Sequence, residues 1–284
     1  MRVGVVGLGN MGSVLAANLV GAGHEVVATD AAGPGRSPDG AGYVASVADV
    51  ARRAEAVVLS LPDGAATEVV ADEIAVTGSR RASHVVDTST IGVAAARAID
   101  ARLAEAGVAY VDAPVSGGVS GARARTLMVM YAAPEDACAA VEPVLAGLSD
   151  RRRRVGDRPG MAQGLKLANN FLSATALAAT SEAIAFGRSL GLDMATMLDV
   201  LNASSGQSAA SRDKFPDHVL TGRYAAGFGN DLMAKDVHLY LRAVEAEGGP
   251  AVLGPLVAAL WERFAAGEPG ADFTRIYPFV AGPS

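Results

Sequence analysis

A glycine-spaced loop between a short apolar run and a helical stretch is the feature that most restricts the fold of this chain. The apolar run Val3–Val6 predicts a buried parallel strand, and Gly7, Gly9 and Gly12 follow it with the spacing G-x-G-x-x-G. In such a loop the first glycine permits a tight turn. The second lets the backbone approach a pyrophosphate, and the third lets the helix pack closely on the strand.

The residues that follow complete a nucleotide-binding half-unit. A helix over about Ser13–Val20 aims its N–H groups and dipole at the phosphates, and two glycines end it. Asp30 ends a second strand, where a carboxylate accepts hydrogen bonds from an adenosine ribose. An ordinary glycine-rich turn would not require these parts in this order. We therefore predict a dinucleotide site whose loop residues are Gly7, Leu8, Gly9, Asn10, Met11 and Gly12.

The alternation of strands and helices in the first half predicts an α/β fold with a Rossmann-type, doubly wound parallel sheet. Further strands are expected at Val57–Leu61, Val85–Asp87, Val108–Asp112 and Leu127–Met130. Strand-like runs cease near Gly160, and Asp193 is the expected N-cap of a later helix. We therefore predict a dinucleotide-binding domain over residues 1–162 and an all-α C-terminal domain over 163–284, joined by a long interdomain helix.

Charge and composition exclude several classes of function. The net charge of −6 argues against bulk attraction to nucleic acid or anionic membranes, and Arg151–Arg154 is interpreted as a solvated turn. The single cysteine, Cys138, excludes an internal disulfide, and the four scattered histidines favour no metal site. Neither a signal peptide nor an apolar stretch of about 20 residues is seen, so a soluble cytoplasmic protein is expected.

The few lysines are the candidates for proton transfer. Of 24 basic residues only Lys166, Lys214 and Lys235 are lysines, and a buried lysine can lose its proton whereas an arginine effectively cannot. Codon bias alone would also explain the excess of arginine. Asn169 and Asn170 follow Lys166 by three and four positions, so they share its helical face. An ammonium and an amide there would hold a hydroxyl or carbonyl oxygen; the alternative is a solvated surface lysine.

Four segments in order carry a resemblance to a known family. They are GLGNMG at 7–12, DAPVSGG at 112–118, GLKLANN at 164–170 and MAKD at 233–236. With them the chain resembles the β-hydroxyacid dehydrogenase family, closest to the 3-hydroxyisobutyrate dehydrogenases. The resemblance implies an NAD(P)-dependent enzyme that interconverts a 3-hydroxy acid and its semialdehyde. It also implies a homodimer or homotetramer.

The resemblance implies roles for individual residues. Lys166 matches the catalytic lysine, and Lys235, with Asp236 as its partner, matches a lysine near the cofactor. The residues implied to contact the substrate are Ser116, Gly117, Gly118, Asn170 and Phe228, and further positions beside the cofactor are Leu61, Pro62 and Thr90.

Departures from the family pattern leave the substrate side chain open. Ala66 stands where some relatives have a cofactor-contacting Asn, and Arg125 replaces a common Gly. Arg123 and Arg125 are either solvated or add positive charge near the carboxylate-binding loop. Asp30 favours NAD over NADP because its charge repels a 2′-phosphate, although Arg36 would allow NADP.

Two other functions fit the same scaffold. An imine reductase usually replaces the catalytic lysine, so Lys166 counts against it. A non-catalytic cofactor-binding protein would be expected to lose Lys166 or the Ser-Gly-Gly loop, and both are present.

Overall fold

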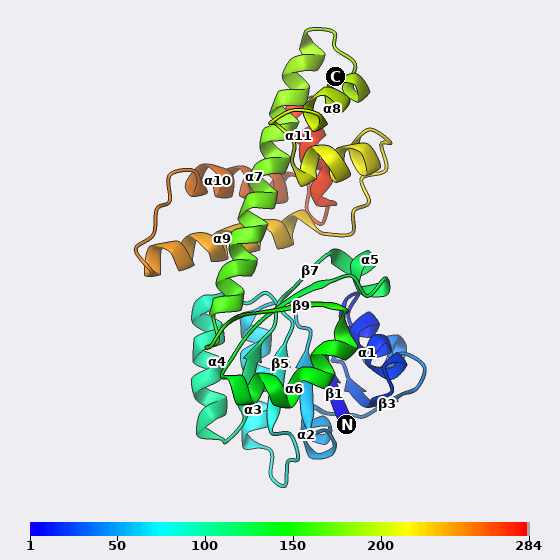
Figure 1. Ribbon diagram of the computed structural model, residues 1–284, viewed down its shortest axis with the longest axis vertical. Coiled ribbons are helices and arrows are strands. Elements are labelled where there is room, and N and C mark those ends of the chain that lie inside the picture. The colour runs from blue at the N-terminus through cyan, green and yellow to red at the C-terminus, as the bar shows by residue number, and fades with distance from the viewer. Residues whose placement is uncertain (283–284) are drawn as a thin grey trace. The chain divides into compact units, whose positions relative to one another are not determined.

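A nine-stranded sheet organises the N-terminal part of the computed structural model, which describes residues 1–282 (Figure 1). Its strands are β1 (Arg2–Val6), β2 (Glu25–Thr29), β3 (Ala41–Tyr43), β4 (Ala56–Leu59), β5 (His84–Asp87), β6 (Ala109–Asp112), β7 (Val115–Ser116), β8 (Met128–Ala132) and β9 (Arg151–Gly156). The order is β3-β2-β1-β4-β5-β6-β8-β7, and β9 pairs with β8. The strands from β3 to β6 are parallel, β8 is antiparallel to β6 and β7, and β9 is parallel to β8.

Helices cover both faces of this sheet, which confirms the predicted doubly wound fold. They are α1 (Gly12–Gly21), α2 (Val47–Arg53), α3 (Gly64–Val76), α4 (Val93–Glu105), α5 (Gly118–Arg123) and α6 (Glu135–Leu148), with a short 3₁₀ turn η1 (Pro34–Arg36). The long helix α7 (Met161–Ser189) begins after β9. The chain divides into two compact units within α7, after Lys166. The domain boundary at residue 162 stays a prediction.

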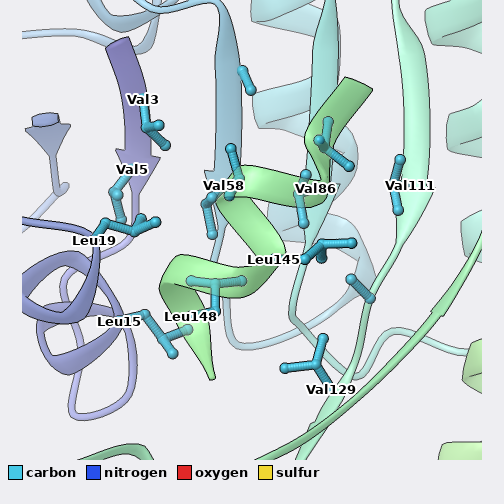
Figure 2. Packing of buried hydrophobic residues seen from close by; sticks show 14 of the residues in the cluster. Val3, Val5, Leu15, Leu19, Val58, Val86, Val111, Val129, Leu145 and Leu148 are labelled. Carbon is cyan, nitrogen blue, oxygen red and sulfur yellow. The ribbon is translucent and has the colours of Figure 1, made fainter. Parts of the chain in front are cut away.

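The central strands are apolar on both faces because each face carries helices. Figure 2 shows the cluster on one face, where Val3, Val5 and Val58 meet Leu15 of α1 and Leu148 of α6. The intervening strand residues point to the opposite face. This alternation explains why the strands read as continuous apolar runs in the sequence.

The opposite face carries a second apolar cluster. Val57 and Leu59 of β4 belong to it, together with Ile74 of α3 and Ile99 of α4. A Cβ added to Gly4 would lie 2.3 Å from a methyl of Val50, so helix α2 packs directly on strand β1 at this glycine.

The second unit is helical over its described residues, 167–282. Besides the remainder of α7 it contains α8 (Met194–Asn202), the π-helical segment η2 (Ala210–Val219), α9 (Asn230–Ala246), α10 (Gly254–Gly267), the 3₁₀ turn η3 (Phe273–Arg275) and α11 (Ile276–Ala281). Its core surrounds Trp261, which is fully buried and donates to the carbonyl of Ala174 at 3.3 Å. Asp193 accepts from the N–H of Thr196, which confirms it as the N-cap of α8. Within residues 1–282, no helix combines the length and the apolar character needed to cross a membrane.

The interpretation of Arg151–Arg154 as a solvated turn is wrong, because these residues form most of β9. Backbone pairing with β8 creates the strand, and the arginine side chains find separate partners. Arg152 pairs with Glu142 at 2.7 Å, and Arg154 donates to the carbonyl of Ala133 at 3.0 Å. A row of positive charges is typical of an outer strand that is protected against pairing with another chain.

A buried carboxylate lies where β5 ends. Asp87 is fully buried; one of its oxygens accepts from the hydroxyl of Tyr110 at 2.9 Å and the other from the N–H of Ser89 at 2.9 Å. Burial raises the pKa of Asp87 from 3.8 to about 6, although these hydrogen bonds oppose the rise. Because the folded pKa exceeds the ordinary value, the ionisation of Asp87 reduces the unfolding free energy as the pH rises from about 4 to about 6.

Tyr110→Phe is expected to lower the unfolding free energy by about 1–3 kcal/mol above pH 6. The loss should shrink below pH 6, where Asp87 is protonated and needs the hydroxyl less. Urea unfolding on either side of that pH measures both effects. Tyr43→Phe is the matched control, because the hydroxyl of Tyr43 donates to the backbone carbonyl of Asp30, which does not titrate. Equal losses for Tyr110→Phe at both pH values would contradict the explanation.

Candidate functional site

The loop after β1 is closed so tightly that only glycine fits two of its positions. Gly7 has a φ of +93°, and a Cβ there would lie 2.3 Å from the carbonyl oxygen of Ser60. A Cβ on Gly12 would lie 2.0 Å from the carbonyl oxygen of Gly7. Gly9 differs, since an added Cβ would meet nothing within 4 Å among the described residues. The protein's own packing therefore does not require glycine at Gly9, whereas close approach of a pyrophosphate to the backbone would.

Helix α1 presents its positive end at this loop. In the part of the chain that the structure describes, no acidic residue lies in its first turn and no side chain caps it. The hydroxyl of Ser13 instead donates back to the carbonyl of Gly9 at 2.9 Å. The N–H groups of Ser13 and Val14 donate to the carbonyls of Gly9 and Met11. The positive end of the helix dipole, which no acidic side chain of the first turn offsets, still favours an anion such as a phosphate at this loop.

The carboxylate of Asp30 is held beside the loop by backbone N–H groups. One oxygen accepts from Ala32 at 2.7 Å and the other from Leu8. A carboxylate oxygen can accept a second hydrogen bond, so both oxygens can still take ribose hydroxyls. Arg36 donates to the side-chain oxygen of Asn10 at 3.1 Å, which places a positive charge on the same loop. These residues fit the adenosine end of a dinucleotide.

The ends of β4 and β5 carry further predicted cofactor positions. Leu61 and Pro62 follow β4, and Thr90 follows β5. The N–H of Leu61 donates to the hydroxyl of Ser89 at 2.9 Å, so the two loops are joined to each other. The parallel strands thus place these residues at the carboxyl edge of the sheet, where α/β folds bind ligands.

The predicted carboxylate-binding loop is a turn of two left-handed glycines. Ser116 pairs with Met128 at the end of β7, and Gly117 and Gly118 follow with φ of +133° and +66°. Ser116 and Gly118 are half-buried and Gly117 is exposed. The turn therefore presents a hydroxyl and backbone N–H groups at the surface of the first unit.

Arg125 is half-buried, and its guanidinium is engaged at the end of α6. It donates to the carbonyls of Ala146 and Gly147 at the end of α6 and pairs with Asp150 at 3.0 Å. It therefore stabilises the C-terminus of that helix. Arg123 is exposed.

Lys166 lies in the first turns of α7 and is only 7% exposed. The interpretation as a solvated surface lysine is therefore wrong. The residue three positions earlier, Gln163, is fully buried and was not identified from the sequence. Its amide donates to the carboxylate of Asp112 at 2.8 Å, and burial raises the pKa of Asp112 from 3.8 to about 6. The only signal in the sequence is a glutamine three residues before the lysine, which does not reveal burial.

Asn170 belongs to a chain of polar contacts within the second unit. It is 5% exposed and donates to the carboxylate of Asp236 at 2.6 Å. Asp236 also pairs with Lys235 at 3.4 Å, as the resemblance implied. Asn169 donates to the side-chain oxygen of Asn170 at 3.1 Å. The orientation of the Asn170 amide is therefore fixed from both sides.

Phe228 packs within the aromatic core of the second unit. Its ring meets that of Phe273 edge to face, with the centroids 5.7 Å apart. The backbone N–H of Phe273 donates to the carbonyl of Phe228 at 2.9 Å. Phe228 is half-buried, so part of its ring remains accessible.

Two family models together match nearly the whole chain. The model for the NAD binding domain of 6-phosphogluconate dehydrogenase matches residues 2–156. The model for NAD-binding of NADP-dependent 3-hydroxyisobutyrate dehydrogenase matches residues 160–280. These matches and the geometry of the glycine loop agree that the chain binds NAD or NADP.

Individual relatives are similar over the full length. The chain is 34% identical to 3-hydroxyisobutyrate dehydrogenase of Pseudomonas aeruginosa, with 99% of this chain and 98% of that protein covered. It is 33% identical to the mitochondrial human enzyme of that name, with 98% and 86% covered. The solved structure of Mycobacterium tuberculosis 3-hydroxyisobutyrate dehydrogenase with L-serine is 31% identical and matches with a TM-score of 0.91, covering 99% of each chain.

An imine reductase from Streptomyces aurantiacus matches with a TM-score of 0.63 and 22% identity, covering 98% of this chain and 99% of that chain. At this identity the match indicates a shared fold only.

Gly9→Ala is expected to weaken NADH binding about tenfold, because the new methyl group intrudes where the pyrophosphate approaches the backbone. The melting temperature should be unchanged, since the methyl group meets no atom of the protein within 4 Å. Fluorescence titration with NADH and thermal unfolding measure the two quantities. Gly21→Ala, at the other end of α1 and equally unobstructed, is the control and should leave NADH binding unchanged. Unimpaired NADH binding by Gly9→Ala would show that the pyrophosphate does not pass this loop.

Proposed function

The chain belongs to the β-hydroxyacid dehydrogenase family, and we propose that it interconverts a 3-hydroxy acid and its semialdehyde. It is an NAD(P)-dependent dehydrogenase that acts on a CH–OH group. The observation that carries the proposal is the full-length similarity to 3-hydroxyisobutyrate dehydrogenases. The relative solved with L-serine, itself a 3-hydroxy acid, supports the same class of substrate.

Lys166 is proposed as the general base in oxidation and the general acid in reduction. Its low exposure and its place in the first turns of α7 support this role. Arginine would keep its proton in the same place. When bound, the nicotinamide accepts or returns the hydride. Lys166 accordingly takes the hydroxyl proton of the substrate in one direction and returns it in the other.

Two further groups are proposed to fix the substrate. The hydroxyl of Ser116 and the N–H groups of the glycine turn would bind its carboxylate, since both are hydrogen-bond donors. Asn170 would bind the reacting oxygen. Its amide nitrogen has two N–H groups, and Asp236 takes one of them. The second N–H remains to orient the substrate oxygen, and Phe228 would line the pocket for its side chain.

NAD is proposed as the preferred cofactor. The carboxylate of Asp30 is held in place by two backbone N–H groups, so it cannot turn away from a 2′-phosphate without losing them. The guanidinium of Arg36 is already engaged with Asn10. Repulsion by Asp30 should therefore outweigh attraction by Arg36.

Self-association into a homodimer or homotetramer is also proposed. Large apolar side chains of the second unit are exposed in the single chain, among them Leu172, Phe186 and Leu256 at 65%, 67% and 71%. Where exposed apolar side chains lie together, such a surface is typical of one that pairs with another protein, and Leu172 and Phe186 share helix α7.

Lys166→Ala is expected to lower turnover of the preferred 3-hydroxy acid about 100-fold or more, while affinity for NADH changes less than about twofold. NADH formation with 3-hydroxyisobutyrate, 3-hydroxypropionate, L-serine and D-glycerate identifies the substrate first. Lys166→Arg should lose turnover as well, because arginine keeps its proton. Lys214 lies elsewhere in the chain, so Lys214→Ala should retain activity. Full activity of Lys166→Ala would refute the catalytic role. If the wild-type chain bound NADH but turned over none of these acids, the substrate class would be wrong.

Asp30→Asn is expected to shift the ratio of kcat/KM for NAD and NADP about tenfold towards NADP, because it removes the charge that repels the 2′-phosphate. The asparagine oxygen can still accept one backbone N–H, so the loop should be retained. Steady-state kinetics with both cofactors provides the measurement. A wild-type preference for NADP would overturn the role assigned to Asp30.

A further inference from the structure

The beginning of α7 is tied to the sheet by one fully buried amide, that of Gln163. Its oxygen accepts the N–H groups of Ile91 at 2.9 Å and Gly92 at 3.1 Å. Its nitrogen donates to the carbonyl of Ser89 at 3.0 Å and to the carboxylate of Asp112 at 2.8 Å. A primary amide has two N–H donors and two acceptor lone pairs, so every hydrogen-bonding position of this side chain is used.

Asp112 fixes the same turn of the helix from a second direction. This residue ends β6, is fully buried, and already binds the Gln163 amide through one carboxylate oxygen. Its other oxygen accepts the backbone N–H groups of Gly160 at 2.9 Å and Gln163 at 3.0 Å. These N–H groups lie at a helix N-terminus, where the backbone offers them no intrahelical partner. The carboxylate of Asp112 therefore has two roles, because it caps α7 and also binds the side-chain amide of Gln163.

This hydrogen-bonded cluster connects directly to the loops that follow β4 and β5. Ser89, whose carbonyl is bound by Gln163, receives the N–H of Leu61 on its hydroxyl at 2.9 Å. Lys166 follows Gln163 by three residues, so the two lie on one side of α7, about one turn apart. Hydrogen bonds thus connect the loop after β4, the loop after β5 and the turn that precedes Lys166.

We propose that Gln163 is a positioning residue for Lys166. It holds the helical turn that bears the lysine at a fixed place relative to Leu61, Ser89 and Thr90, at the edge of the sheet where the cofactor is proposed to bind. The proposal rests on the proposed function of Lys166 as acid and base. Proton transfer requires the positions of the donor and the acceptor to be fixed to within a fraction of an ångström of the reactive geometry. Rigid hydrogen-bonded supports provide that precision.

A purely structural role for Gln163 would require fewer hydrogen bonds than its side chain makes. Asp112 alone caps the helix, so α7 can begin at this place without the bonds of the Gln163 amide to Ser89, Ile91 and Gly92. The amide instead joins two loops and a helix with complete use of its hydrogen bonds. This arrangement is expected where relative position matters as well as stability.

The first test is the kinetics of Gln163→Met, which keeps the length of the side chain and removes all four hydrogen bonds. We expect kcat to fall about tenfold or more while the affinity for NADH changes less than about twofold. In a Lys166→Ala background the same substitution should lower kcat less than about twofold, because Gln163 acts through the lysine. Equal reductions of kcat in both backgrounds would overturn the proposal.

Asn18→Leu is the matched control. The amide of Asn18 is also in the first unit and donates to the carbonyls of Ala122 at 2.9 Å and Leu148 at 3.3 Å. Its loss should lower the melting temperature without the fall in kcat. A fall in kcat equal to that of Gln163→Met would show that general destabilisation is the cause. If Gln163→Met does not fold, Gln163→Glu repeats the test, because it keeps the acceptor and loses the donors to Ser89 and Asp112.

The second test does not depend on activity. The chain has only three lysines, so the reaction of each with an acylating reagent can be followed by mass spectrometry of its peptide. In Gln163→Met we expect Lys166 to react about threefold faster relative to Lys214, because its turn is no longer held. Unchanged labelling of Lys166 would overturn the proposal. Activity retained by Lys166→Ala would refute the lysine mechanism instead, and the labelling would still show whether Gln163 holds the turn.

Discussion

The close contact between the end of β1 and the start of α1 is the constraint on which the rest of the first unit depends. The chain must leave β1, turn and enter a helix within six residues, from Gly7 to Gly12. The carbonyl of Gly7 leaves no room for a side chain on Gly12, and the carbonyl of Ser60, after β4, leaves none on Gly7. The turn is therefore packed against the neighbouring strand as well as its own helix. This contact places the glycine loop at the same edge of the sheet as the loops that follow β4 and β5.

That edge is held together by buried polar groups rather than by apolar packing. Asp87 and Asp112 end adjacent strands, and burial raises the pKa of each to about 6. Burying carboxylates is unfavourable, so each is surrounded by donors: Tyr110 and Ser89 for the first, and Gln163 and the N-terminus of α7 for the second. Apolar side chains in place of Gln163 and Asp112 would leave buried backbone N–H groups without partners and would not fix the directions of the loops. The functional edge therefore contains directional bonds where the two faces of the sheet contain apolar clusters.

The parts of this structure that could be predicted from the sequence are those encoded locally. The glycine spacing predicts the tight turn, Asp30 marks the end of a strand, and Asp193 marks the start of a helix. Each of these signals lies within a few residues of the structure that it predicts. Strand β9 could not be predicted, because four arginines have no apolar pattern and only pairing with β8 makes them a strand. Arg125 and Gln163 were missed or misread for a related reason. Their partners lie 21 or more residues away in the sequence, and burial is decided by the tertiary fold.

The polar groups proposed to act in the reaction are oriented within each unit by that unit's own contacts. In the first unit, Gln163 and Asp112 fix the turn before Lys166. In the second, Asp236 fixes the amide of Asn170, and Lys235 compensates part of the charge that Asp236 buries. Both arrangements consist of contacts within the chain, so the cost of ordering these side chains is met during folding rather than during binding. Binding free energy can then be used for orienting the substrate, which is the condition under which proton and hydride transfer are fastest.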